Sequence, residues 1–441
     1  MLRDKCSERL DILYNLGNGL SSLAELQRSD DSNWYLNTSD FRREARQCFE
    51  IAGSSHGDIQ LKARAKTNHA NLLAQSHRWL EAYELYREAL TLDPKNVIAS
   101  SGAVKVLLRA IHLGIGPRSI LESLAAHYVT QAQLYRGELT KYAGKRDSKI
   151  LDDLPQQLDE SVQWPPDLAN TDEYTRFVGE NHLALSLTIE GLNPDLKRWD
   201  SLSIQSITEN MDVEFGVPPI FAMFNTLKAD YMAARWLAFQ AIHGQVRESG
   251  SYFDTLDYAL YGIKESLLTL AQRSAFDILD RLAVAASEYF RLEGSPTSIY
   301  FLKRWHVMKG RELKKPLEWQ PAILDEVEQG NTALVALSEL AEDIATGGYL
   351  EQKKTLRNAS THRFVILHDL SISKPRKSNF IEHYEFEDFR DQTIASLRMV
   401  RAALIYLVES VSMREARQAR TLGIVAPLEV PLHHWIRSEQ E

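Results

Sequence analysis

Apolar residues recur at spacings of three and four along most of this chain, and that period constrains its fold more than any other feature. In residues 386–411 they form one continuous stripe, and a second stripe runs through residues 224–238. The members of the first stripe are Phe386, Phe389, Leu397, Val400, Leu404, Leu407 and Val411. No run of alternating apolar and polar residues is bounded by turn signals, so no β-sheet is expected. The pattern therefore predicts an all-α protein whose helices each bury one face.

The chain is long enough to need more than one hydrophobic core. Its 441 residues are 44% hydrophobic and 25% charged, the balance of a globular protein, and the length predicts two or three domains. The two cysteines, Cys6 and Cys48, lack the spacing of a zinc site, and their scarcity is typical of a reducing compartment. Because neither a signal peptide nor an uncharged stretch of membrane-spanning length is found, we expect a cytoplasmic protein without membrane contact.

Residues 63–96 carry the pattern of two short helices packed closely against each other. Ala70 is a small residue where the two helices would cross, and Pro94 would end the second helix. The second helix is further marked by Ala82, Tyr86 and Ala89. At these intervals the segment resembles a tetratricopeptide repeat, although His69 stands where that repeat usually has an apolar residue. Similar patterns upstream, with Gly17 at a close-approach position, predict an array of at most three such repeats.

Prolines and carboxylates interrupt the helical pattern after the array. Residues 145–175 contain eight carboxylates together with Pro155 and the pair Pro165-Pro166, which is typical of a linker or domain boundary. We therefore predict four segments: a tetratricopeptide-like array at 1–144, a linker and connecting segment at 145–215, a second helical domain at 216–415 and a tail at 416–441.

A local concentration of basic residues stands out because the chain as a whole is acidic, with a net charge of −9. Residues 350–378 contain seven lysines and arginines against two carboxylates, a net charge of +5. The seven are Lys353, Lys354, Arg357, Arg363, Lys374, Arg376 and Lys377. A nucleic acid needs such a local patch, and we expect Lys353, Lys354 and Arg363 to contact an RNA backbone. A solvated basic helix face is the alternative reading of the same segment.

Within this segment Arg357 is followed directly by Asn358 and, five positions after the arginine, by His362. The same spacing from arginine to histidine occurs in residues 64–69 and 363–368, so the spacing alone is not specific. Of these three arginines, only Arg357 is followed directly by an asparagine. That arrangement resembles the motif of the HEPN superfamily, whose catalytic members are metal-independent endoribonucleases.

Further stretches resemble one branch of HEPN proteins, in which a tetratricopeptide array precedes the nuclease-like domain. The matching stretches are residues 181–195, 218–239, 267–292, 356–364 and 386–407. The resemblance implies a HEPN-type helical bundle, homodimers in which two motifs face each other, and a role as a toxin or phage-defence effector.

The three motif residues suit RNA cleavage by their chemical type. An imidazole with a pKa of about 6.5 can take the proton of a ribose 2′-hydroxyl at neutral pH, which makes His362 the candidate base. A guanidinium stays charged and offers paired donors to phosphoryl oxygens, which suits Arg357, while the amide of Asn358 could orient either group. RNA supplies its own nucleophile, so we expect neither a metal ion nor a cofactor. The expected products are a 2′,3′-cyclic phosphate and a 5′-hydroxyl.

Helix geometry constrains how these residues can act together. Five residues along an α-helix separate two side chains by roughly 140° and about 7.5 Å. Arg357 and His362 therefore cannot readily meet one phosphate from a single straight helix. Either the helix is distorted between them, which Asn358, Ser360 and Thr361 would tolerate, or two chains share the site.

These observations predict an endoribonuclease whose N-terminal array binds a protein or peptide and regulates cleavage. The alternative is a non-enzymatic adaptor, in which the HEPN-like domain only dimerises or binds RNA. Outside the motif, we expect Glu339, Glu342 and Asp343 to form an exposed acidic helix face. Trp236 and Trp305 are expected in the core.

Overall fold

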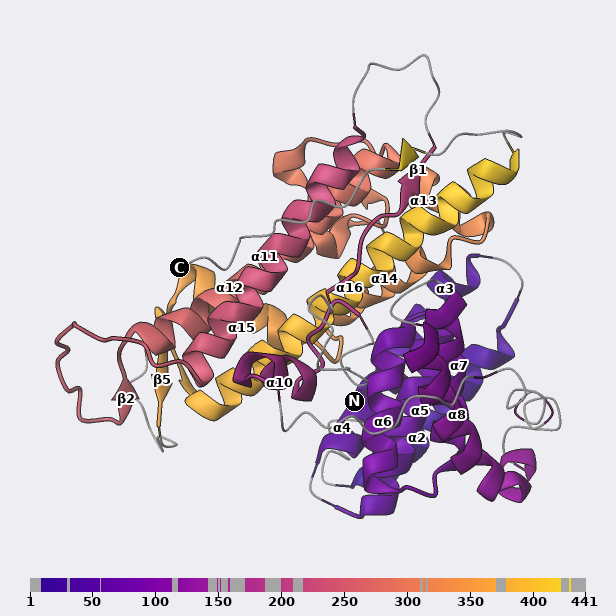
Figure 1. Ribbon diagram of the computed structural model, residues 1–441, viewed down its shortest axis with the longest axis horizontal. Coiled ribbons are helices and arrows are strands. Elements are labelled where there is room, and N and C mark those ends of the chain that lie inside the picture. Colours follow the sequence, from indigo (N-terminus) through magenta and orange to yellow (C-terminus); the bar gives the residue numbers. More distant parts are fainter. Residues whose placement is uncertain are drawn as a thin grey trace.

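The computed structural model describes most of the chain, and helices make up most of the described residues (Figure 1). The described residues are 9–29, 32–55, 57–112, 118–141, 149, 151, 158, 171–186, 200–208, 217–309, 312–314, 316–369, 378–421 and 428–429. The expected all-α class is confirmed, with a small amount of sheet that the sequence pattern did not indicate.

The N-terminal helices pack against one another as an array. They are α2 (Leu10–Leu26), α3 (Trp34–Asn37), α4 (Ser39–Ser54), α5 (Ile59–Gln75), α6 (Trp79–Leu92), α7 (Val97–His112) and α8 (Arg118–Leu134). From α4 to α8, every helix contacts the one that follows it in the chain, as stacked helical hairpins do. The helix pair expected in residues 63–96 is confirmed as α5 and α6, and α6 ends two residues before Pro94.

Small residues let these helices approach closely, as expected. A Cβ atom added to Gly17 would lie 2.8 Å from Cε1 of Phe49, so α2 and α4 could not pack this closely around a larger residue. In the same way, a Cβ atom added to Gly102 of α7 would overlap the ring of Tyr86 in α6. The array therefore depends on glycine at these two helix contacts.

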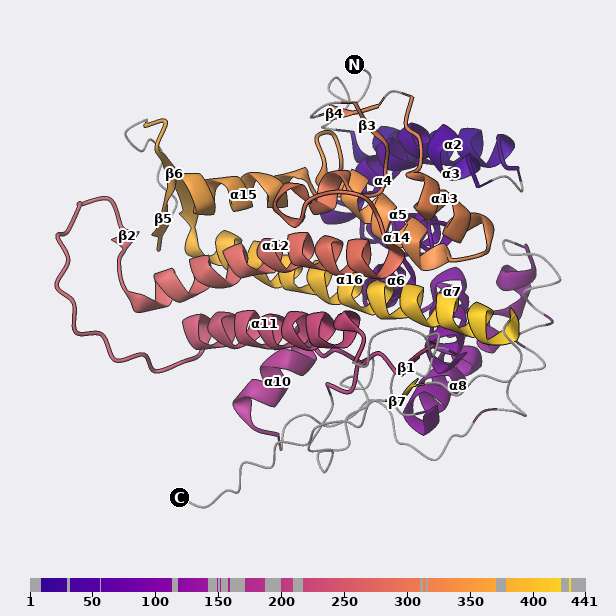
Figure 2. The same ribbon diagram turned by 90° about the horizontal axis from the view of Figure 1, so that it is seen from above.

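Three long helices form the centre of the second part of the molecule. The elements of this part are α10 (Glu173–Glu180), α11 (Pro219–Ile242), α12 (Ile263–Phe290), η3 (Pro296–Ser298), η4 (Phe301–Lys303), α13 (Pro321–Glu328), α14 (Thr332–Ile344), α15 (Glu351–His362) and α16 (Phe386–Thr421). The long helices α11, α12 and α16 pack against one another, with α14 against α16 and α15 against α12 (Figure 2). We call this group the bundle.

A three-stranded sheet follows α15 and corrects the expectation that the chain has no sheet. It consists of β2 (Ala259–Leu260), β5 (Phe364–His368) and β6 (Ile381–Glu385), in the order β2-β5-β6. β5 pairs antiparallel with β2 and parallel with β6. Two further short pairs join β1 (Ser206–Ile207) to β7 (Leu428–Glu429) and β3 (Met308–Lys309) to β4 (Glu312–Leu313). β5 is a short apolar run, and the period of such a run cannot separate a strand from a buried helix.

One continuous cluster of buried apolar side chains joins the array to the bundle. It extends from Ala70 in α5 to Val411 in α16. Trp305 belongs to this cluster and is fully buried, as expected. Trp236 was also expected in the core, but it is 46% exposed on α11. The array and the bundle thus share one core.

The predicted domain boundaries before residues 145 and 216 fall outside the described residues, so they stay predictions. At the C-terminal end, α16 continues to Thr421, past the predicted start of the tail at residue 416. No helix in the described ranges is both long and apolar enough to cross a membrane.

Candidate functional site

The helix with the Arg–His motif, α15, starts from a turn that requires glycine. The backbone amide of Leu350 donates to the carbonyl of Asp343 over 3.0 Å and so closes the turn on the end of α14. Gly347 has a φ of +85°, which favours glycine, and a Cβ atom added to Gly348 would overlap the carbonyl group of Asp343. Backbone contacts with α14 therefore fix where α15 begins.

The backbone of α15 is α-helical from Glu351 to His362, and β5 begins two residues later. The α-helix is unbroken between Arg357 and His362, so the backbone separation of roughly 140° and about 7.5 Å applies to them. The side chains of residues 357–362 lie outside what the structure describes, and the roles expected for Arg357, Asn358 and His362 stay predictions.

Lys353 was expected to contact RNA, but the residue is only 7% exposed. Its Nζ donates to Oε1 of Gln392 in α16 over 3.2 Å, and burial lowers its pKa to about 8. Lys353 and the buried Leu356 lie three residues apart and share the inward face of α15. Lys353 therefore does not belong to the outer surface of this helix.

The other two residues expected to contact RNA lie nearer the surface. Lys354 is half-buried, with Nζ 3.4 Å from Oγ1 of Thr346. Arg363 is exposed and forms an ion pair with Glu382 of β6. The remaining basic residues of the patch, Lys374, Arg376 and Lys377, lie outside the described residues. An RNA contact at Lys354 and Arg363 stays a prediction.

The two other arginine-to-histidine spacings end in buried histidines. His69 lies on α5 and is 1% exposed. His368 lies on β5, where its Nε2 is 2.9 Å from Nδ1 of His383 in β6. Neither histidine is accessible to an RNA chain, so neither spacing provides an alternative to residues 357–362.

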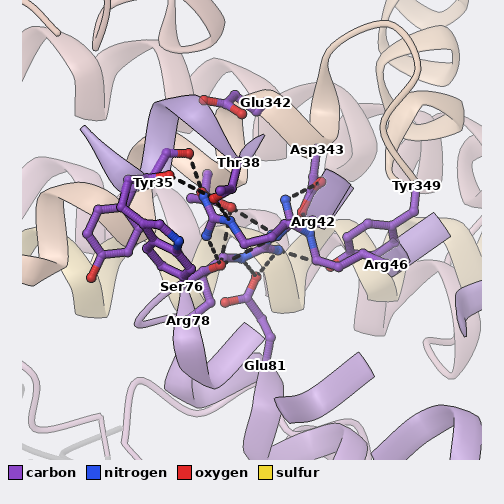
Figure 3. Close-up of polar contacts among 12 residues, drawn as sticks. Tyr35, Thr38, Arg42, Arg46, Ser76, Arg78, Glu81, Glu342, Asp343 and Tyr349 are labelled. Atoms are coloured by element: carbon purple, nitrogen blue, oxygen red, sulfur yellow. Dashed lines mark hydrogen bonds and ion pairs between the residues drawn. The ribbon is translucent and has the colours of Figure 1, made fainter. Parts of the chain in front are cut away.

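A buried group of charges joins the array to α14 (Figure 3). It consists of Arg42, Arg46, Arg78, Glu339 and Asp343, which we call the arginine clamp. Arg42 and Arg46 project from α4, Arg78 directly precedes α6, and both carboxylates lie on α14. Nη1 of Arg46 lies 2.9 Å from Oε2 of Glu339, and its Nε lies 2.8 Å from Oδ2 of Asp343. Arg42 binds Glu339 and Arg78 binds Asp343.

The clamp corrects the expectation that α14 has an exposed acidic face. Glu339 and Asp343 are fully or almost fully buried, and Glu342 is buried with its Oε1 3.4 Å from Nε2 of His306. Carboxylates can be buried here because the array brings cations to them.

Charges within the clamp are balanced once Glu81 is included, since that carboxylate binds Arg78 from the first turn of α6. Burial raises the pKa of Glu339, but the charges of Arg42 and Arg46 outweigh it and hold the pKa below its usual value. Nη2 of Arg78 also donates to the hydroxyl of Tyr349 over 3.0 Å. The array therefore holds both α14 and the turn before α15.

The sequence itself carries a signal for the clamp, in the spacing of its charges. Arg42 and Arg46 are four residues apart, as are Glu339 and Asp343, so each helix presents a pair of like charges on one face. Such pairs are unfavourable unless the opposite pair faces them. The partners are 297 residues apart in the chain, which no local pattern spans.

Within the described ranges, no three His, Cys, Asp or Glu side chains form a group that could hold a metal ion.

The sequence model of the family described as LA2681-like HEPN matches residues 211–414. Neither a curated protein nor a solved structure matches the chain. The matched residues include α11, α12, α14, α15 and most of α16, and thus the acidic side of the clamp and the Arg–His motif. Residues 211–414 are therefore similar in sequence to the HEPN domains of the LA2681-like family.

Proposed function

We propose that this protein is a metal-independent endoribonuclease of the HEPN type, which leaves a 2′,3′-cyclic phosphate and a 5′-hydroxyl. The observation that carries the proposal is the place of Arg357, Asn358 and His362 at the end of α15, inside the matched HEPN domain. His362 would take the proton of the 2′-hydroxyl, and Arg357 would stabilise the charge that develops on the phosphate. Asn358 would orient one of these groups or bind a phosphate oxygen.

The unbroken backbone of α15 supports a site shared by two chains. A straight helix separates Arg357 from His362 by too large an angle for both to meet one phosphate. In a symmetric dimer, the same segment of each chain lies beside the two-fold axis, so Arg357 of one protomer could act with His362 of its partner.

We further propose that the array controls cleavage, as a toxin or phage-defence effector would require. The clamp holds α14 to α4 and α6, and the turn at Gly348 fixes α15 on the end of α14. A protein or peptide that moved α4 or α6 would therefore move the helix with the motif.

Cleavage of single-stranded RNA by the full-length protein in EDTA tests the proposal. His362→Ala and Arg357→Ala should each reduce cleavage by about 100-fold or more without changing the helical circular-dichroism spectrum. His112→Ala changes an exposed histidine of α7 and should keep full activity. Cleavage that needs a divalent metal and survives in His362→Ala would overturn the assignment. RNA binding without any cleavage would instead support the adaptor.

A further inference from the structure

A cavity of about 800 Å³ lies between the array and the bundle. Its array wall comes from α4, α5 and α6, and its other wall comes from the turn at Gly348, α15 and α16. A volume of this size is typical of pockets that bind small molecules. The cavity therefore lies where an occupant would touch the array and the helix with the Arg–His motif at once.

The bundle wall of the cavity contains two cations with unused hydrogen-bond donors. Lys353 uses one of its three N–H groups, for Gln392, and Arg398 uses its Nε–H for the carbonyl of Asn181. Among the described residues, neither side chain has an ion-pair partner. Burial, together with the charge of Arg398, lowers the pKa of Lys353 to about 8, although the charge of Glu50 opposes them. A buried ammonium without a carboxylate partner is costly, and a bound anion would relieve that cost.

The array wall adds a buried polar atom that lacks a partner. His69 is 1% exposed and lines the cavity, and its Nε2 has no hydrogen-bond partner. Its Nδ1 lies 3.5 Å from Oε2 of Glu50, and its ring packs edge-on against Tyr349. His69 is also the residue that departs from the usual apolar residue of the repeat. A ligand that forms a hydrogen bond with Nε2 would explain why a polar side chain is buried at this position.

Five carboxylates line the cavity in the described part of the chain, and three of them have Lys or Arg partners. Glu81, Glu84 and Glu88 bind Arg78, Arg401 and Lys66, respectively. Glu50 accepts a hydrogen bond from Oγ of Ser54 over 3.0 Å and faces His69. Glu351 accepts a hydrogen bond from the backbone of Gly347. The hydrogen-bond donors of the cavity that still lack an acceptor are therefore mainly N–H groups of Lys353 and Arg398, and oxygen atoms of a ligand could accept from them.

We propose that this cavity binds the oxyanion of a small ligand, a carboxylate or a phosphate, between Lys353 and Arg398 and opposite His69. Lys353 lies one helical turn before Arg357 on α15, so a bound ligand links α5 of the array to the helix with the motif. This regulatory consequence rests on the proposed ribonuclease function, whereas the binding site itself does not.

Thermal unfolding of the full-length protein tests the binding site without any RNA. The chain is compared in sodium chloride, sodium acetate and sodium phosphate at equal ionic strength. One of the two oxyanions should raise Tm above the value in chloride, because a ligand that binds only the folded state stabilises it. Lys353→Met and Arg398→Met should each lose most of that shift, measured against their own values in chloride. Lys309→Met removes an exposed lysine of β3 and should keep the full shift.

The outcomes separate the possible ligands and the possible failures. A shift in phosphate alone indicates a phosphate ester, and a shift in acetate alone indicates a carboxylate ligand. His69→Phe keeps the contact of an aromatic ring with Tyr349 but removes Nε2, so it should lose part of the shift. The proposal is overturned if neither oxyanion raises Tm, or if Lys353→Met, Arg398→Met and His69→Phe all shift as the wild type does. If the oxyanion raises Tm but RNA is not cleaved, the binding site is supported and the regulatory consequence is refuted.

Discussion

Replacing Asp343 with alanine would leave two buried guanidinium groups short of a partner. Asp343 binds Arg46 and Arg78, and all three side chains are fully buried. Removing one partner of a buried ion pair costs about 3–5 kcal/mol, because the remaining charge stays out of water. In the variant, Arg46 keeps its ion pair with Glu339, and Arg78 keeps its ion pair with Glu81. We therefore expect the free energy of unfolding to fall by about 3 kcal/mol, the lower end of that range.

Urea unfolding of the full-length protein, followed by far-ultraviolet circular dichroism, measures this loss as a lower midpoint. Asp230→Ala is the matched control because it removes a partly exposed ion pair with Arg281. Such pairs contribute less than about 1 kcal/mol, so the control should change the free energy of unfolding little. A loss in Asp343→Ala no larger than in the control would refute the reasoning. The clamp would then not hold the array to α14, and the proposed route to α15 would lose its basis.

Three further outcomes are expected. Lys353→Met should stabilise the fold by at most about 3 kcal/mol below about pH 8, since the buried ammonium has a pKa of about 8 against roughly 10.4 when unfolded. The gain should vanish as the pH rises through about 10.4, where the lysine is neutral in both states, and a gain independent of pH in urea unfolding would contradict this. Gly348→Ala should cost about 1–3 kcal/mol in the same assay because its Cβ atom would overlap Asp343, whereas Gly19→Ala, with open space around its Cβ position, should not destabilise. Mixed Arg357→Ala and His362→Ala chains should regain part of the RNA cleavage, and verified heterodimers without activity would favour a site within one chain.

Local patterns were sufficient to predict the helices. Apolar spacing of three and four residues predicted α11 and α16, and small residues such as Gly17 marked the helix contacts of the array. β5 was missed because five apolar or aromatic residues carry no distinguishable period. The burial of Trp236 was predicted wrongly because the sequence of a mostly apolar helix does not show which of its faces is left without a packing neighbour.

The candidate site was predicted only as far as single segments allow. The motif residues 357–362 could be placed on a helix because they are adjacent in the chain. The burial of Lys353 and Glu339 could not be predicted, because it depends on residues of distant segments. Gln392 lies 39 residues after Lys353, and Arg42 lies 297 residues before Glu339. From the sequence of one helix alone, a pair of like charges on one face is interpreted as solvent-exposed, because the helix that packs against it is not known.

The continuous core and the clamp limit how proteins of this kind can be divided or recombined. A fragment restricted to residues 211–414 would expose the apolar face that meets α5 and α6 and would leave Glu339 and Asp343 without their arginines. An array transplanted from another protein would fit only if it brought arginines to the positions of Arg42, Arg46 and Arg78. Exchange between such proteins should therefore succeed when the crossover keeps the array and α14 together, and a change of specificity should arise on the outer faces of the array.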